Sequence, residues 1–149
     1  MRQAWNTTIA ENRKALFDYE IIEEFEAGIV LFGPEVKSVR AWQVNLKWAY
    51  ITTHSGRPVL VGCHISEYKN NSATKIDPKR ERLLLLSQKQ ILRLSQKTKD
   101  MGATIVPIEI YSKWNLFKVR IALAKWRKKW EKKNLLKERD LDRETRKLW

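Results

Sequence analysis

The chain has 149 residues and a mass of 17.7 kDa, which predicts one domain with at most an appendage and leaves no room for a two-domain enzyme. Hydrophobic residues make up 43% of the chain, so it can bury a core and is not disordered throughout. The formal net charge of +13 and a pI near 10.0 point to a polyanionic partner, either nucleic acid or an anionic membrane surface.

The first predicted elements are two strands within 17–32, where β-branched and aromatic residues dominate. We expect them to form a hairpin with its turn around Glu26–Gly28. The Gly33-Pro34 pair ends the second strand, and proline suits the first turn of a short helix over 34–41.

A second hairpin is predicted from two further strand-like segments, 46–53 and 57–65, which are separated by His54–Gly56. The polar segment 68–80 has the composition of a loop. The four leucines at 83–86 fit either a short buried strand or the approach to a helix.

A helix is predicted to begin after Ser87, because Ser87 and Gln90 match a capping box. It should run to Met101 and end at Gly102. Two strands, 104–111 and 115–124, follow. Many short strands with only two helices favour a mainly β fold, a small antiparallel barrel with flanking helices, over a parallel sheet.

Positive charge and turn residues divide the chain at the same place. Residues 1–111 hold 16 basic and 12 acidic side chains, whereas residues 112–149 hold 14 basic and 5 acidic ones. All glycines and prolines fall between Gly28 and Pro107. We therefore predict a body over 1–124 and a basic tail over 125–149.

The tail has helical propensity but only a thin apolar stripe, formed by Trp126, Trp130, Leu141 and Leu148. Such a stripe is too narrow to anchor a helix on the body. A solvated charged helix and a frayed tail are both compatible with this pattern. We expect the tail to become helical on a partner that neutralises its charge.

Catalytic and metal-binding motifs are lacking in the sequence. His54, Cys63 and His64 form no known metal or nucleophile pattern, and the single cysteine rules out an internal disulfide. A metal-dependent nuclease is the enzyme alternative, and it would have to use the clustered carboxylates Glu20, Glu23, Glu24 and Glu26. Close spacing in a strand sends those carboxylates to both faces, so we predict no enzyme, no metal and no cofactor.

The nucleic-acid signals are stronger. A basic barrel with interleaved aromatic side chains is a base-stacking platform in a positive field. The candidates for stacking are Tyr68, Tyr111, Trp114, Trp126 and Trp130. A small ribosomal or single-stranded-RNA-binding protein with a basic arm fits this pattern as well. No apolar run approaches the roughly 20 residues that span a bilayer, and the first residues lack a signal-peptide pattern, so we expect a cytoplasmic protein.

An ordered series of motifs is more specific than any of these patterns. The series is ENRKALFDYEIIEEFEAGIVLFGPEVKSVRA (11–41), VNLKWAY (44–50), HIS (64–66), DPKRERLLLL (77–86), LAK (123–125) and KERD (137–140). It resembles the SsrA-binding protein family, SmpB, over nearly the whole chain. The resemblance implies an oligonucleotide-binding-type (OB-type) β-barrel with flanking helices and a C-terminal tail that becomes helical when bound.

The resemblance also implies a role in trans-translation. Members bind the tRNA-like domain of transfer-messenger RNA and deliver it to stalled ribosomes, where the tail enters the decoding centre and the mRNA channel. The implied partners are therefore transfer-messenger RNA and small-subunit ribosomal RNA, with no membrane involved, and the free protein is expected to be a monomer.

The resemblance assigns site residues in two groups. Those expected to bind transfer-messenger RNA are Asn12, Glu26, Glu35, Lys37, Ser38, Arg40 and Leu85, together with the basic Lys118, Arg120 and Lys125. Leu85 is expected to act from beneath the surface, and Lys37 and Arg40 to meet phosphate. Those expected at the decoding centre are Arg127, Lys128, Lys129, Trp130, Glu131, Lys132 and Lys133, with Trp130 stacking on a base.

The chain departs from the family pattern at four positions. Trp42 and Trp126 stand where the family usually has glycine, Trp48 where aspartate is common, and Glu67 where proline follows the HIS motif. Because glycine often marks a backbone conformation that bulky residues avoid, we expect altered turn geometry at the two lost glycines.

Overall fold

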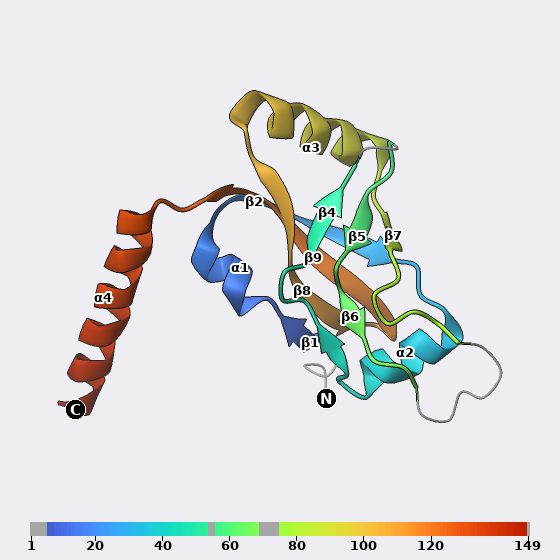
Figure 1. Ribbon diagram of the computed structural model, residues 1–149, viewed down its shortest axis with the longest axis horizontal. Helices are drawn as coiled ribbons and strands as arrows, with labels where there is room; N and C mark the ends of the chain where they lie inside the picture. Colours follow the sequence, from blue (N-terminus) through green and yellow to red (C-terminus); the bar gives the residue numbers. More distant parts are fainter. Residues whose placement is uncertain (1–5, 54–55, 69–74, 149) are drawn as a thin grey trace.

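The computed structural model describes residues 6–53, 56–68 and 75–148 (Figure 1). The strands are β1 (Asn6–Glu11), β2 (Tyr19–Ile29), β3 (Val44–Asn45), β4 (Tyr50–Thr52), β5 (Val59–Val61), β6 (His64–Ile65), β7 (Arg82–Leu85), β8 (Thr104–Lys113) and β9 (Leu116–Trp126). The helices are α1 (Arg13–Asp18), α2 (Gly33–Arg40), α3 (Gln88–Met101) and α4 (Lys129–Lys147).

The main sheet closes on itself. Its strands pair in the order β8-β4-β5-β7-β2-β9, and β9 pairs back onto β8, so these strands form a ring. Strand β1 adds to β8 outside the ring, and β3 and β6 form a separate two-stranded sheet. All these pairings are antiparallel, which confirms the predicted fold class of a mainly β, barrel-like domain with flanking helices.

Two apolar clusters hold the elements together. The larger one includes Leu60, Ile110 and Ile121, which the ring strands contribute, and Leu94 of α3 packs into it. The smaller cluster places Ala15 of α1 against alanine, valine and isoleucine side chains of β8 and β9. Helix α1 is thus fixed on the sheet by burial of a short apolar face.

The hairpin predicted within 17–32 is wrong. Residues 19–29 form one continuous strand, β2, which pairs with β9 from Tyr19 to Gly28, and residues 17–18 end helix α1. Gly28 makes no turn. A Cβ atom at this position would lie 3.2 Å from Cβ of Leu85, so the glycine permits the close approach of β7.

Most other predicted elements are confirmed. Helix α3 begins with the Ser87–Gln90 capping box and ends at Gly102, whose φ is +60°. Residues 82–85 form a strand, and β8 and β9 form the predicted hairpin. The pair β4–β5 is shorter than predicted, and two residues of its turn, His54 and Ser55, lie outside the described residues.

The sequence patterns missed β1 and α1, and they placed the end of the sheet too early. Strand β9 continues through Lys125 to Trp126, which lies opposite Tyr19 of β2. Helix α4 then confirms the predicted helical propensity of the tail and buries none of its residues. It stands apart from the ring of strands (Figure 1). The dependence of its order on a partner stays a prediction.

Trp42 ends helix α2 in a conformation that normally needs glycine. The amide of Trp42 donates to the carbonyl of Val39 and that of Gln43 to Ser38, both at 3.0 Å, which is the Schellman pattern. Trp42 has a φ of +64°, and its side chain is 58% exposed. The expected altered geometry is thus present at Trp42. It is absent at Trp126, whose φ is not positive.

Replacing Trp42 by glycine should stabilise the protein. A left-handed residue other than glycine costs about 1–2 kcal/mol, and the greater freedom of glycine in the unfolded chain offsets about 0.4–1 kcal/mol of that. We expect Trp42→Gly to raise the free energy of unfolding by about 0.5–1 kcal/mol in urea titrations. Trp126→Gly removes the same side chain from a strand and should lower the free energy of unfolding. A Trp42→Gly variant no more stable than the parent would contradict the strain argument.

Candidate nucleic-acid interface

The β-sheet brings predicted site residues from separate strands onto one face. Glu26 and Gly28 alternate on β2, and the register sets Arg120 beside Glu26, and Lys118 beside Gly28. Leu85 of β7 flanks Gly28 on the other side. Paired residues share a face of a sheet, so strands β7, β2 and β9 assemble a surface that we call the sheet face. Its members are Glu26, Leu85, Lys118 and Arg120. Tyr111 of β8 lies opposite Lys118 but is only 5% exposed, so this predicted stacking candidate does not present its ring to a base.

Leu85 differs from the expectation that it packs beneath the surface. Its side chain is 57% exposed, because burial alternates along β7 and this position points outward. It presents an apolar contact beside the charged groups of the sheet face. The described geometry therefore gives Leu85 direct access to a partner.

Glu26 is held by a hydrogen-bond network. The hydroxyl of Tyr111 donates to one carboxylate oxygen of Glu26, and Nζ of Lys113 lies 3.3 Å from both oxygens. The guanidinium of Arg120 lies 5.3 Å from the centre of the Tyr111 ring and pairs with Glu109 at 3.2 Å. The Tyr111 hydrogen bond lowers the pKa of Glu26, and the contacts with Lys113 add to this. Glu26 is thus an anion that accepts hydrogen bonds.

The same network raises the pKa of Tyr111 to about 12, through burial first and then the hydrogen bond to Glu26. Replacing Glu26 by glutamine removes the anion, so we expect the tyrosine pKa to fall toward its ordinary value near 10. Ultraviolet titration of the phenolate measures it, with Tyr111→Phe identifying the signal. An unchanged titration in Glu26→Gln would show that the carboxylate does not act on Tyr111.

Helix α2 presents some of its predicted residues and buries others. Lys37 and Arg40 are exposed, and Nζ of Lys37 lies 5.2 Å from the centre of the Tyr68 ring. Glu35 is only 4% exposed and Ser38 is fully buried, so neither side chain lies on the surface predicted to meet RNA. On this helix, Lys37 and Arg40 are therefore the predicted residues that can still contact phosphate.

Glu35 anchors α2 to the body through a buried ion-pair cluster. Its two carboxylate oxygens receive Arg80 and Arg82, each with an N–O distance of 2.5 Å, and the amide of Phe32 donates to it at 3.0 Å. Burial raises the pKa of Glu35, but the hydrogen bonds from Arg80, Phe32 and Arg82 outweigh it and lower the pKa below its ordinary value. Because Arg82 is itself fully buried, this cluster anchors helix α2, which carries Lys37 and Arg40, to the body.

Asn12 likewise acts inside the fold. It is 3% exposed; its side-chain oxygen accepts from the amide of Ala15 at 3.1 Å, and its side-chain nitrogen donates to the carbonyl of Pro107 at 3.0 Å. The first contact caps α1 and the second ties that cap to β8. Asn12 therefore positions α1, and its side chain does not reach the surface on which RNA was expected.

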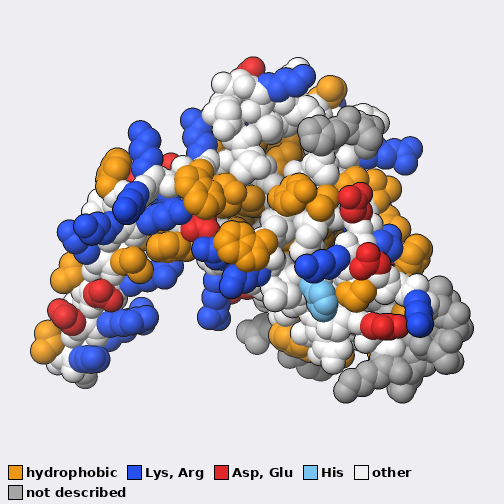
Figure 2. Space-filling model, in the orientation of Figure 1, with side chains coloured by type: hydrophobic (Ala, Val, Ile, Leu, Met, Phe, Trp, Pro, Cys, Tyr) orange, Lys and Arg blue, Asp and Glu red, His pale blue; other side chains and the backbone are white. Residues whose placement is uncertain are grey.

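The predicted tail residues lie on β9, the linker and α4. Lys125 lies exposed on β9 and Arg127 follows it; Lys128, Lys129, Trp130 and Lys133 are exposed, and Glu131 and Lys132 are half-buried. Figure 2 shows Lys and Arg side chains along α4, with hydrophobic side chains between them.

Helix α4 contacts the body through Asp18 of α1. Nζ of Lys132 lies 3.1 Å from one oxygen of Asp18, and Lys14 pairs with the other at 3.3 Å. The amide of Arg127 also donates to the carbonyl of Asp18 at 2.7 Å. These contacts place the start of the tail beside α1.

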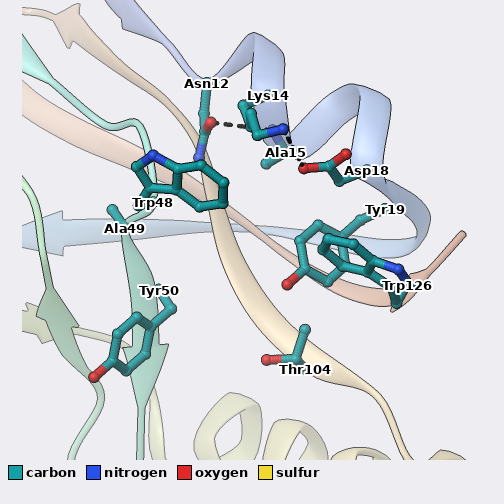
Figure 3. Close-up of a pocket in the computed structure, with 10 residues that line it drawn as sticks. All are labelled: Asn12, Lys14, Ala15, Asp18, Tyr19, Trp48, Ala49, Tyr50, Thr104 and Trp126. Atoms are coloured by element: carbon teal, nitrogen blue, oxygen red, sulfur yellow. Dashed lines mark hydrogen bonds and ion pairs between the residues drawn. The ribbon is translucent and has the colours of Figure 1, made fainter.

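An aromatic pocket near α1 was missed by the sequence patterns (Figure 3). Tyr19, Trp48, Tyr50 and Trp126 line it from three separate segments. One signal for it was available in the sequence, because Asn12 is a residue type that caps helices and its side chain accepts from the amide of Ala15. This cap would have predicted helix α1, which forms one side of the pocket.

The enzyme alternative finds no support in the described structure. Glu23 turns toward α3 and pairs with Arg93 at 2.9 Å, whereas Glu26 bonds to Tyr111, so these carboxylates do not converge. No group of three His, Cys, Asp or Glu side chains in the described ranges is placed to hold a metal ion. In the same ranges, no helix has the length and apolar character needed to cross a membrane.

Comparisons with known proteins match this arrangement. The family model described as SmpB protein matches residues 9–149. An SsrA-binding protein of a Sulfurihydrogenibium species is 47% identical over 93% of this chain and 91% of its own, and one of a Wolbachia species of Brugia malayi is 48% identical over 94% and 95%. A chain from a solved structure of tmRNA-SmpB and the bacterial ribosome is 40% identical with a TM-score of 0.66, covering 80% of this chain and 85% of that one. The chain belongs to the SmpB family, whose curated relatives are SsrA-binding proteins.

Proposed function

We propose that this protein binds the tRNA-like domain of transfer-messenger RNA and brings it to stalled ribosomes in the cytoplasm, acting as a monomer until it binds. The observation that carries the proposal is the family match over residues 9–149, which spans both the body and the tail. The related solved structure contains tmRNA and SmpB in the context of the bacterial ribosome. The protein performs no chemistry of its own in this role.

The body supplies the surfaces for transfer-messenger RNA. On the sheet face, Lys118 and Arg120 provide positive charge beside the anionic Glu26, which can accept a hydrogen bond from a base amino group. Lys37 and Arg40 of α2 add phosphate contacts, which position an RNA without reading its sequence. The sheet face combines side chains of both charges with the exposed Leu85. Such a mixed surface suits a folded RNA better than a uniformly basic groove does.

The tail supplies the surface for the ribosome. Helix α4 buries no residue, and Trp130 at its start is 62% exposed and follows Lys128 and Lys129. An exposed indole in a basic segment is suited to stack on a base of the decoding centre. Residues 127–133 are proposed to lie there, with the rest of α4 in the mRNA channel.

Selectivity tests the proposal directly. The tRNA-like domain should outcompete an unstructured RNA of equal length in a filter-binding assay at physiological salt. A generic RNA-binding protein would also bind through phosphate neutralisation, so salt dependence alone does not separate the two functions. Equal binding of both RNAs would favour the generic protein and contradict our proposal.

Trp130→Ala should lower peptide tagging on stalled ribosomes by about tenfold, the effect of losing one stacked base. Trp130→Tyr keeps an aromatic face and should be tolerated. Leu92→Ala is the control, because Leu92 is 59% exposed on α3, away from the residues proposed to meet the ribosome, and this variant should tag as the parent does. Reconstituted tagging measures all three variants. Equal losses with alanine and tyrosine at position 130 would argue against stacking.

A further inference from the structure

A pocket of about 230 Å³ lies between α1, the turn before β4 and the end of β9 (Figure 3). Tyr19 and Trp126 form one wall; their rings pack edge to face with centroids 5.1 Å apart and planes at 88°. Trp48 and Tyr50 supply further aromatic lining, and both are at least half exposed. Segments far apart in the sequence thus converge on an open, aromatic cavity.

Trp48 occupies this site at a conformational cost. The amide of Ala49 donates to the carbonyl of Leu46 at 2.9 Å, which closes a tight turn, and Trp48 in that turn has a φ of +67°. Bulky residues avoid this left-handed conformation. The side chain is 67% exposed, so burial does not offset the cost. Residues held in such conformations cluster at binding sites, so the conformation of Trp48 points to a binding role for its surroundings.

Two lysines lie against the aromatic walls. Nζ of Lys14 is 4.9 Å from the centre of the Trp48 ring, and Nζ of Lys132 is 3.8 Å from the centre of a Trp126 ring. Both ammonium groups also pair with Asp18, so that carboxylate is neutralised by the two cations. The pocket therefore combines stacking surfaces with positive charge at its edge.

We propose that this pocket takes one unpaired nucleobase of the RNA partner, with Trp48 as a stacking surface and Lys14 beside the attached phosphate. Aromatic faces with neighbouring cations are the chemistry that recognises a single-stranded nucleotide. The cavity is smaller than the roughly 300 Å³ at which pockets for larger ligands begin, which fits one base. The net charge of +13 favours an anionic nucleotide over a cationic ligand. The inference rests on the proposed function and adds a base site to it.

Trp48→Gly and Trp42→Gly form a matched pair for the test. Both replace an exposed tryptophan with a positive φ, and Trp42 does not line this pocket. We expect Trp48→Gly to weaken binding of the tRNA-like domain of transfer-messenger RNA at least about fivefold, although relief of strain keeps its melting temperature at or above that of the parent. Trp42→Gly and Trp48→Phe should bind as the parent does.

The outcomes separate this inference from the proposed function. If the parent protein binds the tRNA-like domain selectively but Trp48→Gly binds as tightly as Trp42→Gly, the base site is wrong and the proposed function stands. Equal weakening by Trp48→Phe and Trp48→Gly would also overturn stacking. With RNA carrying 4-thiouridine, crosslinks to the peptide containing Trp48 should come from an unpaired nucleotide. Crosslinks to that peptide from paired nucleotides alone would contradict the proposal, and an aromatic protein segment would then be the occupant to consider.

Discussion

A chain that ends at Lys128 should still bind transfer-messenger RNA and should fail to support peptide tagging on stalled ribosomes. The cut removes α4 and keeps all of β9, which continues to Trp126. Residues 129–149 carry 8 basic and 5 acidic side chains, so the net charge falls only from +13 to +10. We therefore expect RNA affinity within about threefold of the full chain, because few phosphate contacts are lost.

Tagging should fall to background, because the proposed decoding-centre residues from Lys129 onward are missing. Filter binding of the tRNA-like domain and reconstituted tagging measure the two activities on the same preparations. Removal of the Lys132–Asp18 ion pair leaves Asp18 paired with Lys14, so the truncated body should remain folded, as circular dichroism can verify. Tagging by the truncated protein at the level of the full chain would show that the tail has no role in decoding.

Glu35→Gln should destabilise the body more than any other single carboxylate change proposed here. It leaves Arg82, which is fully buried, without its anion, and breaking a buried ion pair costs about 3–5 kcal/mol. That is a large part of the roughly 5–15 kcal/mol by which domains are stable. Urea denaturation should therefore show a strongly lowered midpoint. Glu23→Gln is the control: Glu23 pairs with Arg93 and Lys97 at the surface, where such pairs contribute about 0–1 kcal/mol.

The pH dependence gives a second test of the Glu35 cluster. The folded-state pKa of Glu35 lies below its unfolded value, so its stabilising contribution is complete above about pH 4.3 and is lost as the pH falls through the folded pKa. The difference in stability between the parent and Glu35→Gln should be constant near neutral pH and shrink in acid. A difference that does not change between pH 7 and pH 3 would contradict this assignment.

The elements with strong local signals could be predicted from the sequence. Capping at Ser87 and Gln90, the glycine at 102 that ends the helix and the apolar segments that form β8 and β9 each depend on neighbouring residues. The hairpin turn at Gly28 was predicted wrongly, because a glycine that permits the close approach of another strand gives the same sequence signal as a glycine in a turn. That distinction depends on Leu85, which is distant in the sequence.

In the candidate site too, contacts between residues that are distant in the sequence could not be predicted. The family motifs identified Asn12, Glu35 and Ser38, but only the structure shows that they are buried and act through other groups. The helix that carries the exposed Lys37 and Arg40 is anchored by the Glu35 cluster, whose ion pair with Arg80 joins residues 45 positions apart. The pocket around Trp48 was out of reach because its walls come from segments that only the closed sheet brings together.

The structure also shows on which elements the positive charge of the chain lies. Residues 112–128 hold 6 basic side chains and no acidic one, and most of them lie on β8, β9 and the linker. The positive field is therefore centred on the body and on the joint with the tail, more than on α4. This agrees with a body that binds RNA firmly and a tail that acts through a few residues near its start.

The most direct test of the central claim is the identity of the RNA that co-purifies with the protein from its own cells. Sequencing of that RNA, normalised to total cellular RNA, should show transfer-messenger RNA as the dominant enriched species, with enrichment retained by the chain that ends at Lys128. Recovery of ribosomal, transfer and messenger RNA in proportion to their abundance would contradict the account and identify a generic RNA-binding protein.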